Sequence, residues 1–201
     1  MTSPEQATVF LCSPRAQGNS DTAGLAFAKG LTEAGYTPRI IWLREHDITP
    51  CRGCGRCAAE PDHRCPFAGD GAEPLFEAMM TSPIVAFAAP IFFYHLPGIF
   101  KNFIDRAQRY YTVRLEKEAS GADLGPERMA QILLVSGRRE GRQLFTGSLL
   151  TLKYFLWPFG IRLDDEPALL RGFDGPNDLA ADTEAVDALI AKGKAAGEMA
   201  Q

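Results

Sequence analysis

The sequence contains no apolar run long enough to cross a membrane, no excess of basic charge, no internal repeat and no low-complexity segment. No window approaches the roughly 18 apolar residues of a membrane-spanning helix, and the first residues lack a basic leader followed by a long apolar stretch. The 21 Lys and Arg residues are outnumbered by 25 Asp and Glu residues, so no global basic field attracts nucleic acid or an anionic membrane. We therefore expect a cytoplasmic protein with no nucleic-acid or membrane partner and with small-molecule chemistry.

What is present is a globular composition with a repeated order of strand, loop and helix. The 201 residues are 46% hydrophobic and 23% charged, enough to bury one core, so we expect a single domain over residues 1–201. Short apolar runs predict strands at residues 8–13, 39–43, 83–90, 131–137 and, with more polar character, 160–169. Helical spacing is found at residues 20–35, 73–80, 98–111, 142–159 and 179–199.

This alternation predicts the fold class. Apolar strands separated by helices are typical of a doubly wound α/β domain, here a five-stranded parallel sheet with helices on both faces. The long irregular stretches are then the cysteine region and residues 115–129. The polar residues of the fifth strand indicate an edge of the sheet, and its acidic group is expected to be solvated rather than to bind a metal: Asp164, Asp165 and Glu166.

The loop after the first predicted strand reads SPRAQGNSDT, residues 13–22. In a doubly wound sheet this loop lies beside the binding edge, and the helix that follows it offers free amide groups to an anion. The loop carries neither GxxxxGK nor GxGxxG, which favours a phosphomonoester over a di- or triphosphate. The alternative is that Ser20 only caps the helix and Pro14 only shapes a turn. The residues that we expect to surround a phosphate are Ser13, Arg15, Asn19, Ser20 and Thr22.

The loop after the third predicted strand is aromatic and apolar. Its first residues are Pro90, Ile91, Phe92, Phe93 and Tyr94, at the edge where the sheet offers its ligand site. Such side chains suit a flat heteroaromatic ring, and the alternative is that they are buried in the core. A phosphate site beside an aromatic slot predicts FMN as the cofactor.

Four of the five cysteines lie in an insert at residues 50–66: Cys51, Cys54, Cys57 and Cys65. Three evenly spaced cysteines and a fourth are typical of iron–sulfur ligation, because two intervening residues let the chain curl round a cubane cluster. Zinc sites more often use two Cys-x2-Cys pairs, and disulfides are usually reduced in the cytoplasm. We favour a [4Fe–4S] cluster, with free thiols, a disulfide or zinc as alternatives.

Other residues near these cysteines have simpler expected roles. Arg52, Arg56 and Arg64 are expected to lower the thiol pKa values and offset the negative charge of a cluster, unless they are only solvated. Cys12, at the end of the first strand, is expected to be a buried apolar residue rather than a ligand.

The motifs SPRAQGNSDT, Cys-x2-Cys-x2-Cys and PIFFYHLPGIFKNFIDR together resemble the flavodoxin-like NADPH-dependent FMN reductase family, and specifically its iron–sulfur flavoprotein branch. The resemblance implies that residues 13–22 bind the FMN phosphate, that residues 90–94 line the isoalloxazine ring, and that a loop beginning at Ser136 and Gly137 approaches the ring. It also implies a [4Fe–4S] cluster near the flavin of a neighbouring subunit, in a homodimer or homotetramer. One departure is Phe92, where many relatives have tyrosine.

Three functions follow from these expectations. The first is an FMN-dependent redox flavoprotein that transfers electrons between FMN, a [4Fe–4S] cluster and a ferredoxin-like electron carrier. The second is a cluster-free reductase that takes hydride from NAD(P)H and reduces a small molecule such as a quinone or free flavin. The third is a non-enzymatic flavin or nucleotide binding module. A basic group after the fourth strand is expected to meet either NADPH phosphates or an acidic carrier: Arg138, Arg139 and Arg142.

Overall fold

The computed structural model describes residues 6–200. It contains a parallel sheet in the order β2-β1-β3-β4-β5, with a further short strand, β6, also paired to β4. This is the flavodoxin-like order, which confirms the predicted fold class. The strands are β1 Gln6–Leu11, β2 Thr37–Trp42, β3 Val85–Pro90, β4 Arg128–Ser136, β5 Ile161–Leu163 and β6 Ala168–Arg171.

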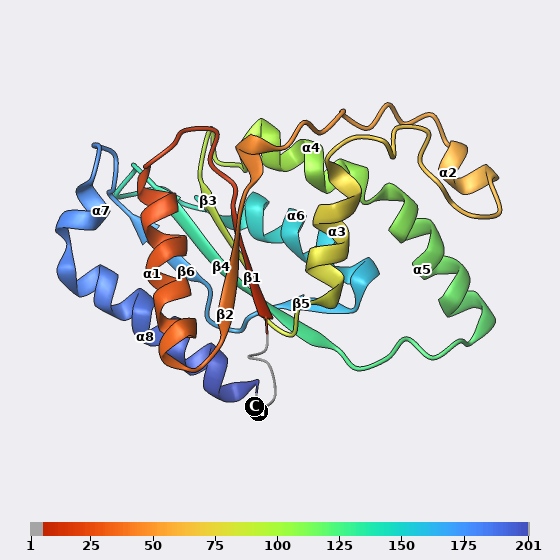
Figure 1. The fold of residues 1–201 in the computed structure, drawn as a ribbon. Coiled ribbons are helices and arrows are strands. Elements are labelled where there is room, and N and C mark those ends of the chain that lie inside the picture. Colours follow the sequence, from red (N-terminus) through yellow and green to blue (C-terminus); the bar gives the residue numbers. More distant parts are fainter. Residues whose placement is uncertain (1–5, 201) are drawn as a thin grey trace.

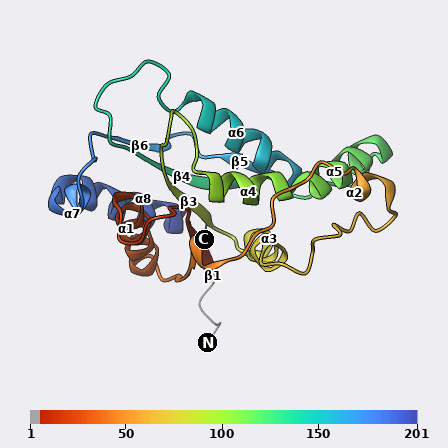
Figure 2. The ribbon, with the colours of Figure 1, turned by 90° about the horizontal axis from the view of Figure 1, so that it is seen from above.

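Helices cover both faces of the sheet, as Figure 2 shows from above. One layer holds α1 Asn19–Glu33, α7 Asp178–Ala181 and α8 Thr183–Met199. The other holds α3 Ala72–Thr81, α4 Gly98–Arg106 and α6 Thr146–Leu156, with α5 Gln108–Ser120 continuing from α4. Shorter helical turns are η1 Leu43–Glu45, α2 Arg56–Ala59 and η2 Trp157–Phe159. No helix in residues 6–200 is long and apolar enough to cross a membrane.

The alternation of side chains along β1 explains the two layers. Val9 and Leu11 point into the core beneath α1 and α8, whereas Phe10 and Cys12 point into the core beneath α3, α4 and α6. Cys12 is fully buried, as expected, and burial raises the pKa of its thiol well above the usual value. A strand with apolar residues on both faces has to be central, and β1 lies between β2 and β3.

The predicted fifth strand is two short strands. β5 pairs with the start of β4 and β6 pairs with its end, and the chain between them bulges away. Asp164 fills this break: its N–H donates to the Ala130 carbonyl, and its carboxylate accepts from Ile132 N–H at 3.1 Å and from Lys192 Nζ at 2.7 Å. The expectation of a solvated carboxylate is therefore wrong for Asp164, which is buried and whose pKa is raised by that burial.

The α5 helix and the cysteine region project together from one side of the domain (Figure 1). The predicted irregular stretch at residues 115–129 is helical as far as Ser120, so the helix after the aromatic loop is longer than its apolar spacing indicated. None of its residues is fully buried, which is why the hydrophobic pattern fades along it. The irregular part is residues 121–127.

Candidate functional site

Three loops meet at the carboxyl edge of the sheet, at the top of Figure 1. β1, β3 and β4 are neighbours, and their pairing runs to the last residues: Cys12 N–H donates to the Ala88 carbonyl, and Ile91 N–H donates to the Val135 carbonyl, both at 2.8 Å. The loops that follow these strands carry the predicted phosphate, ring and third-loop residues. The topology thus brings the predicted residues to one edge.

The first loop leaves the start of α1 without a side-chain cap. The residue before the helix is Gly18, so the alternative in which Ser20 caps the helix is wrong. The free amides of the first turn and the helix dipole together favour an anion there. The exposed Arg15 guanidinium lies beside this turn, because a Cβ at Gly18 would be 3.5 Å from Arg15 Nε. Ser13 is buried and its Oγ accepts the Arg15 N–H at 3.1 Å.

Two of the predicted phosphate residues have structural contacts. Asn19 uses both amide protons on the carbonyls of Phe173 and Gly175, each at 3.0 Å, and its Oδ1 accepts Leu179 N–H. Its side-chain donors are therefore occupied, and its backbone amide is what remains for a ligand. Thr22 donates through its hydroxyl to the Gly18 carbonyl at 3.5 Å.

Arg44, which the sequence pattern did not single out, holds the first loop in place. Its guanidinium pairs with the buried carboxylate of Asp21 at 3.0 Å and also donates to the carbonyls of Ser13 and Arg15. It stacks on Trp42 at 4.5 Å as well. A buried carboxylate in the first turn would repel an anion, and this ion pair neutralises it.

The aromatic loop forms a tight exposed turn. Phe92 and His95 exchange backbone hydrogen bonds at 2.9 Å, and the central residues Phe93 and Tyr94 have φ values of 49° and 64°. Positive φ at bulky residues costs about 1–3 kcal/mol each, and such strain gathers at functional sites. Phe93 is 102% exposed and Phe92 is 44% exposed, so the alternative of buried core aromatics is wrong for this turn.

The third loop and a segment missed by sequence analysis complete the edge. Arg138 lies over the Tyr94 ring at 5.5 Å, and a Cβ at Gly141 would be 3.1 Å from the Tyr94 hydroxyl, so the turn contacts the loop after β4. Ser136 is buried and accepts Arg138 N–H. Asp174, from the β6–α7 loop, lies against Gly137. That loop is distant in the sequence, and hydrogen bonds from Asn19 to the carbonyls of Phe173 and Gly175 hold it at this edge.

The four clustered cysteines line one small pocket with residues of α4 and α5. All four are free thiols, and the space between them is about 30 Å³, room for about two waters. Burial raises the pKa of Cys57, and the charges of Cys65, Cys51 and Cys54 raise it further. For Cys57 this corrects the expectation of a lowered thiol pKa. Nearby arginines have other contacts or face solvent: Arg52 stacks on Phe67, Arg56 pairs with Glu60, and Arg64 is exposed.

The residues of this pocket fit an iron–sulfur cluster in donor type and charge. Within residues 6–200 no group of His, Cys, Asp or Glu side chains is arranged to hold a metal ion. A cubane cluster needs less convergence, because each thiolate binds its own iron. Two arginines that line the pocket, Arg106 and Arg109, each leave a buried Nε without a partner, and these N–H groups favour an anion.

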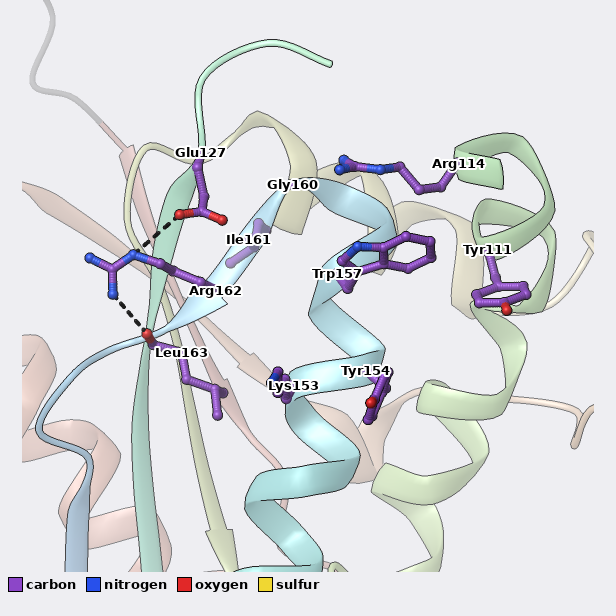
Figure 3. Close-up of a pocket in the computed structure, with 10 residues that line it drawn as sticks. All are labelled: Tyr111, Arg114, Glu127, Lys153, Tyr154, Trp157, Gly160, Ile161, Arg162 and Leu163. Carbon is purple, nitrogen blue, oxygen red and sulfur yellow. Dashed lines mark hydrogen bonds and ion pairs between the residues drawn. The ribbon is translucent and has the colours of Figure 1, made fainter. Parts of the chain in front are cut away.

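A separate cavity of about 460 Å³ lies at the opposite, amino end of the sheet. Figure 3 shows Tyr111, Tyr154 and Trp157 on its walls, with Arg162 bonded to Glu127 at its side. It is formed by α5, the end of α6, and β5. Because none of the three loops at the carboxyl edge contributes to it, we do not assign it to a redox cofactor.

Comparison with known proteins finds one matching family model, several distant relatives and many solved structures of similar fold. A model of the family NADPH-dependent FMN reductase matches residues 6–149. An iron–sulfur flavoprotein of Methanocaldococcus jannaschii is 25% identical over 96 residues, which cover 48% of this chain and 48% of that protein. One of Archaeoglobus fulgidus is 27% identical over 81 residues, covering 40% of this chain and 38% of that protein. The alignments thus span about half or less of these relatives.

Among solved structures, an NAD(P)H:quinone oxidoreductase from Methanothermobacter marburgensis has the same fold. It superposes with a TM-score of 0.66 at 17% identity and covers 99% of this chain and 100% of that one. At this identity the likeness concerns the fold alone. The family match spans well over half of the chain and includes all three loops of the carboxyl edge up to Leu149. The chain belongs to the NADPH-dependent FMN reductase family of flavodoxin-like oxidoreductases.

Proposed function

We propose that this FMN-dependent oxidoreductase exchanges electrons between FMN, a [4Fe–4S] cluster held by Cys51, Cys54, Cys57 and Cys65, and a ferredoxin-like electron carrier. When bound, FMN supplies two-electron chemistry and the cluster supplies single-electron transfer. The observation that carries the proposal is the shared pocket of four free thiols beside two buried, unpartnered guanidinium N–H groups. The names of the curated relatives support it.

Each loop of the carboxyl edge has a task in this proposal. The free amides at the start of α1, including that of Asn19, hold the FMN phosphate together with Ser13, Arg15, Ser20 and Thr22. Residues 90–94 hold the isoalloxazine ring. The turn at Phe93 and Tyr94 is already formed without the ring, and its positive φ values store backbone strain. Ser136 and Gly137 close the ring site from β4.

The second candidate is a cluster-free reductase that transfers hydride from NAD(P)H to a quinone or similar small molecule. It is favoured by the small space among the four thiols, about 30 Å³. Arg138, Arg139 and Arg142 would then meet the phosphates of NAD(P)H instead of an acidic carrier. Anaerobic purification separates the two, because a brown protein with iron supports the first and a yellow protein with FMN alone supports the second.

We further propose that residues 1–201 form one FMN-binding domain with a cysteine-rich insert at residues 50–66, and that it acts as a homodimer or homotetramer in the cytoplasm. The five cysteines are all free, as is usual in a reducing compartment. Residues 1–5 and 201 lie outside the described residues. Gel filtration with light scattering tests the assembly.

Arg15→Ala tests the phosphate site. We expect FMN binding to weaken by about 1.5–3 kcal/mol, the usual worth of a hydrogen bond to a charged group, or roughly 10- to 150-fold in Kd. Riboflavin, which lacks the phosphate, should bind as to the wild type, with both affinities measured by fluorescence quenching. Lys29→Ala, an exposed cation near the other end of α1, is the matched control and should change neither. Equal losses for FMN and riboflavin would refute the assignment of Arg15.

Phe93→Ala tests the ring site. The side chain is fully exposed, so the free energy of unfolding should change by no more than about 0.5 kcal/mol. The absorption spectrum or midpoint potential of bound FMN should shift, because an aromatic neighbour is lost. Leu150→Ala removes another exposed apolar side chain, on α6, and should leave both unchanged. A flavin spectrum and potential identical to those of the wild type would show that this turn does not contact the ring.

A further inference from the structure

Arg106 and Arg109 form one side of the thiol pocket. Arg106 ends α4 and Arg109 belongs to the first turn of α5, three residues on, so both side chains reach the same neighbourhood. Both line the pocket together with the four cysteines. Each Nε is buried and has no hydrogen-bond partner. Buried N–H groups are seldom left unpaired, so these two remain free for an acceptor brought next to the two arginines.

Arg106 also closes the base of the cysteine segment. The residue is 3% exposed, and its guanidinium donates to the carbonyls of Thr49 at 3.0 Å and Phe67 at 3.1 Å, on the two sides of the segment. It pairs with Asp70, whose carboxylate accepts the N–H groups of Thr49 at 2.8 Å and Ala72 at 3.0 Å. These hydrogen bonds and the guanidinium lower the pKa of Asp70 against the effect of burial. The Arg106–Asp70 ion pair therefore joins the two ends of the cysteine segment.

Arg109 is fixed in a similar way from α3. Its guanidinium donates to Glu73 at 3.1 Å and lies over the Tyr110 ring at 4.7 Å, while the Tyr110 hydroxyl donates to the same carboxylate at 3.2 Å. Burial and the charge of Glu73 raise the pKa of Tyr110 to about 12, so the phenol stays neutral. Asp70 and Glu73 thus hold the terminal nitrogens of the two guanidinium groups, and neither carboxylate meets Nε.

We propose that Arg106 and Arg109 are positioning residues for the cluster: their Nε–H groups donate to the sulfur atoms held in the thiol pocket, and Arg106 locks the cysteine segment closed. The inference rests on the proposed function for its ligand. Hydrogen bonds to sulfur and nearby positive charge stabilise the more negative, reduced form of a cluster and so raise its potential. The exposed arginines of the segment are placed less well for this task, because solvent screens their charge.

Arg109→Leu tests the charge contribution. In anaerobically reconstituted protein, an EPR-monitored redox titration should show a lower midpoint potential, with the ratio of reduced to oxidised cluster falling about tenfold at a fixed potential, which is 59 mV for one electron. Arg109→Lys keeps the charge and should recover part of the shift. Arg64→Leu, beside Cys65 but exposed, is the matched control and should shift the potential far less. Equal potentials for Arg109→Leu and Arg64→Leu would overturn the inference.

Limited trypsin digestion tests the lock without any iron. In iron-free protein loaded with FMN, cleavage after Arg52, Arg56 and Arg64 should be at least several-fold faster in Arg106→Lys than in wild type, while FMN content stays the same. Arg114→Lys is the matched control and should digest like wild type, because Arg114 contacts Glu118 and Trp157 and not the cysteine segment. An unchanged cleavage rate in Arg106→Lys would overturn the role of Arg106 as a lock.

The two experiments separate failure of the inference from failure of the proposed function. If the wild type loads iron and the arginine variants behave like their controls, only the inference fails. If reconstituted wild type binds FMN but no iron, the proposed function fails and the charge role of Arg109 fails with it. The digestion result still decides whether Arg106 locks the segment.

Discussion

Replacement of Cys57 by serine is expected to remove most of the iron from reconstituted protein while leaving FMN bound. Wild-type protein should contain about four irons and four sulfides per chain, the composition of a cluster with four thiolate ligands. Cys57 lines the thiol pocket together with Cys51, Cys54 and Cys65. The proposed FMN contacts lie in other loops, at residues 13–22 and 90–94. Iron, sulfide and flavin assays on the same samples give the measurement.

Cys12→Ser is the matched control for this experiment. Cys12 is the remaining cysteine and lies fully buried in the core, outside the thiol pocket. Its replacement should lower stability and leave iron content unchanged. The contrary result would be wild-type protein with stoichiometric FMN, no iron after reconstitution, and a Cys57→Ser variant that is equally fast with NAD(P)H-linked acceptors. The cluster-free reductase would then be the better description.

The parts of the fold that depend on local pattern were predicted correctly. The central strands β1, β3 and β4 are continuous apolar runs because both faces of the sheet are covered, and such runs are visible in the sequence. The amphipathic helices α1 and α8 show a similar local signal. The split between β5 and β6 was not predicted, because it depends on Asp164 contacting β4 and Lys192, residues far away in the sequence.

The candidate site likewise has features that the sequence predicts and features that it does not. Its loops could be located because parallel strands end at a common edge, so residues 13–22 and 90–94 were placed together by topology alone. The individual contacts could not be predicted, since they join segments that are distant in the sequence: Asn19 with the β6–α7 loop, Arg44 with Asp21, and Arg106 with Asp70. Arg106 stood in a quoted motif, but only burial and its unpartnered Nε identify a role. The spacing of the cysteines placed them in one segment, but it did not indicate that α5 lies beside that segment.

Gly30→Ala is expected to cause the largest loss of stability of the substitutions considered. Gly30 lies in α1 where α8 crosses it, and a Cβ there would be 1.9 Å from the carbonyl oxygen of Ile190. The reciprocal contact is as tight, since a Cβ at Gly193 would be 2.0 Å from the carbonyl oxygen of Phe27. Both obstacles are helix backbone, which cannot rotate aside as a side chain does. One helix therefore has to move.

We expect Gly30→Ala to lower the free energy of unfolding by about 3 kcal/mol, at the upper end of the usual cost of overpacking, and the melting temperature by roughly 6–12 °C. Thermal and urea unfolding followed by circular dichroism measure this. Gly98→Ala is the matched control, because Gly98 is also helical but has open space around it, so the change should be neutral or slightly stabilising. FMN should stabilise both variants, and its affinity for Gly30→Ala should fall if α1 moves, because the loop assigned to the phosphate precedes the same helix. A melting temperature equal to that of the wild type would mean that α8 does not pack against α1 this closely.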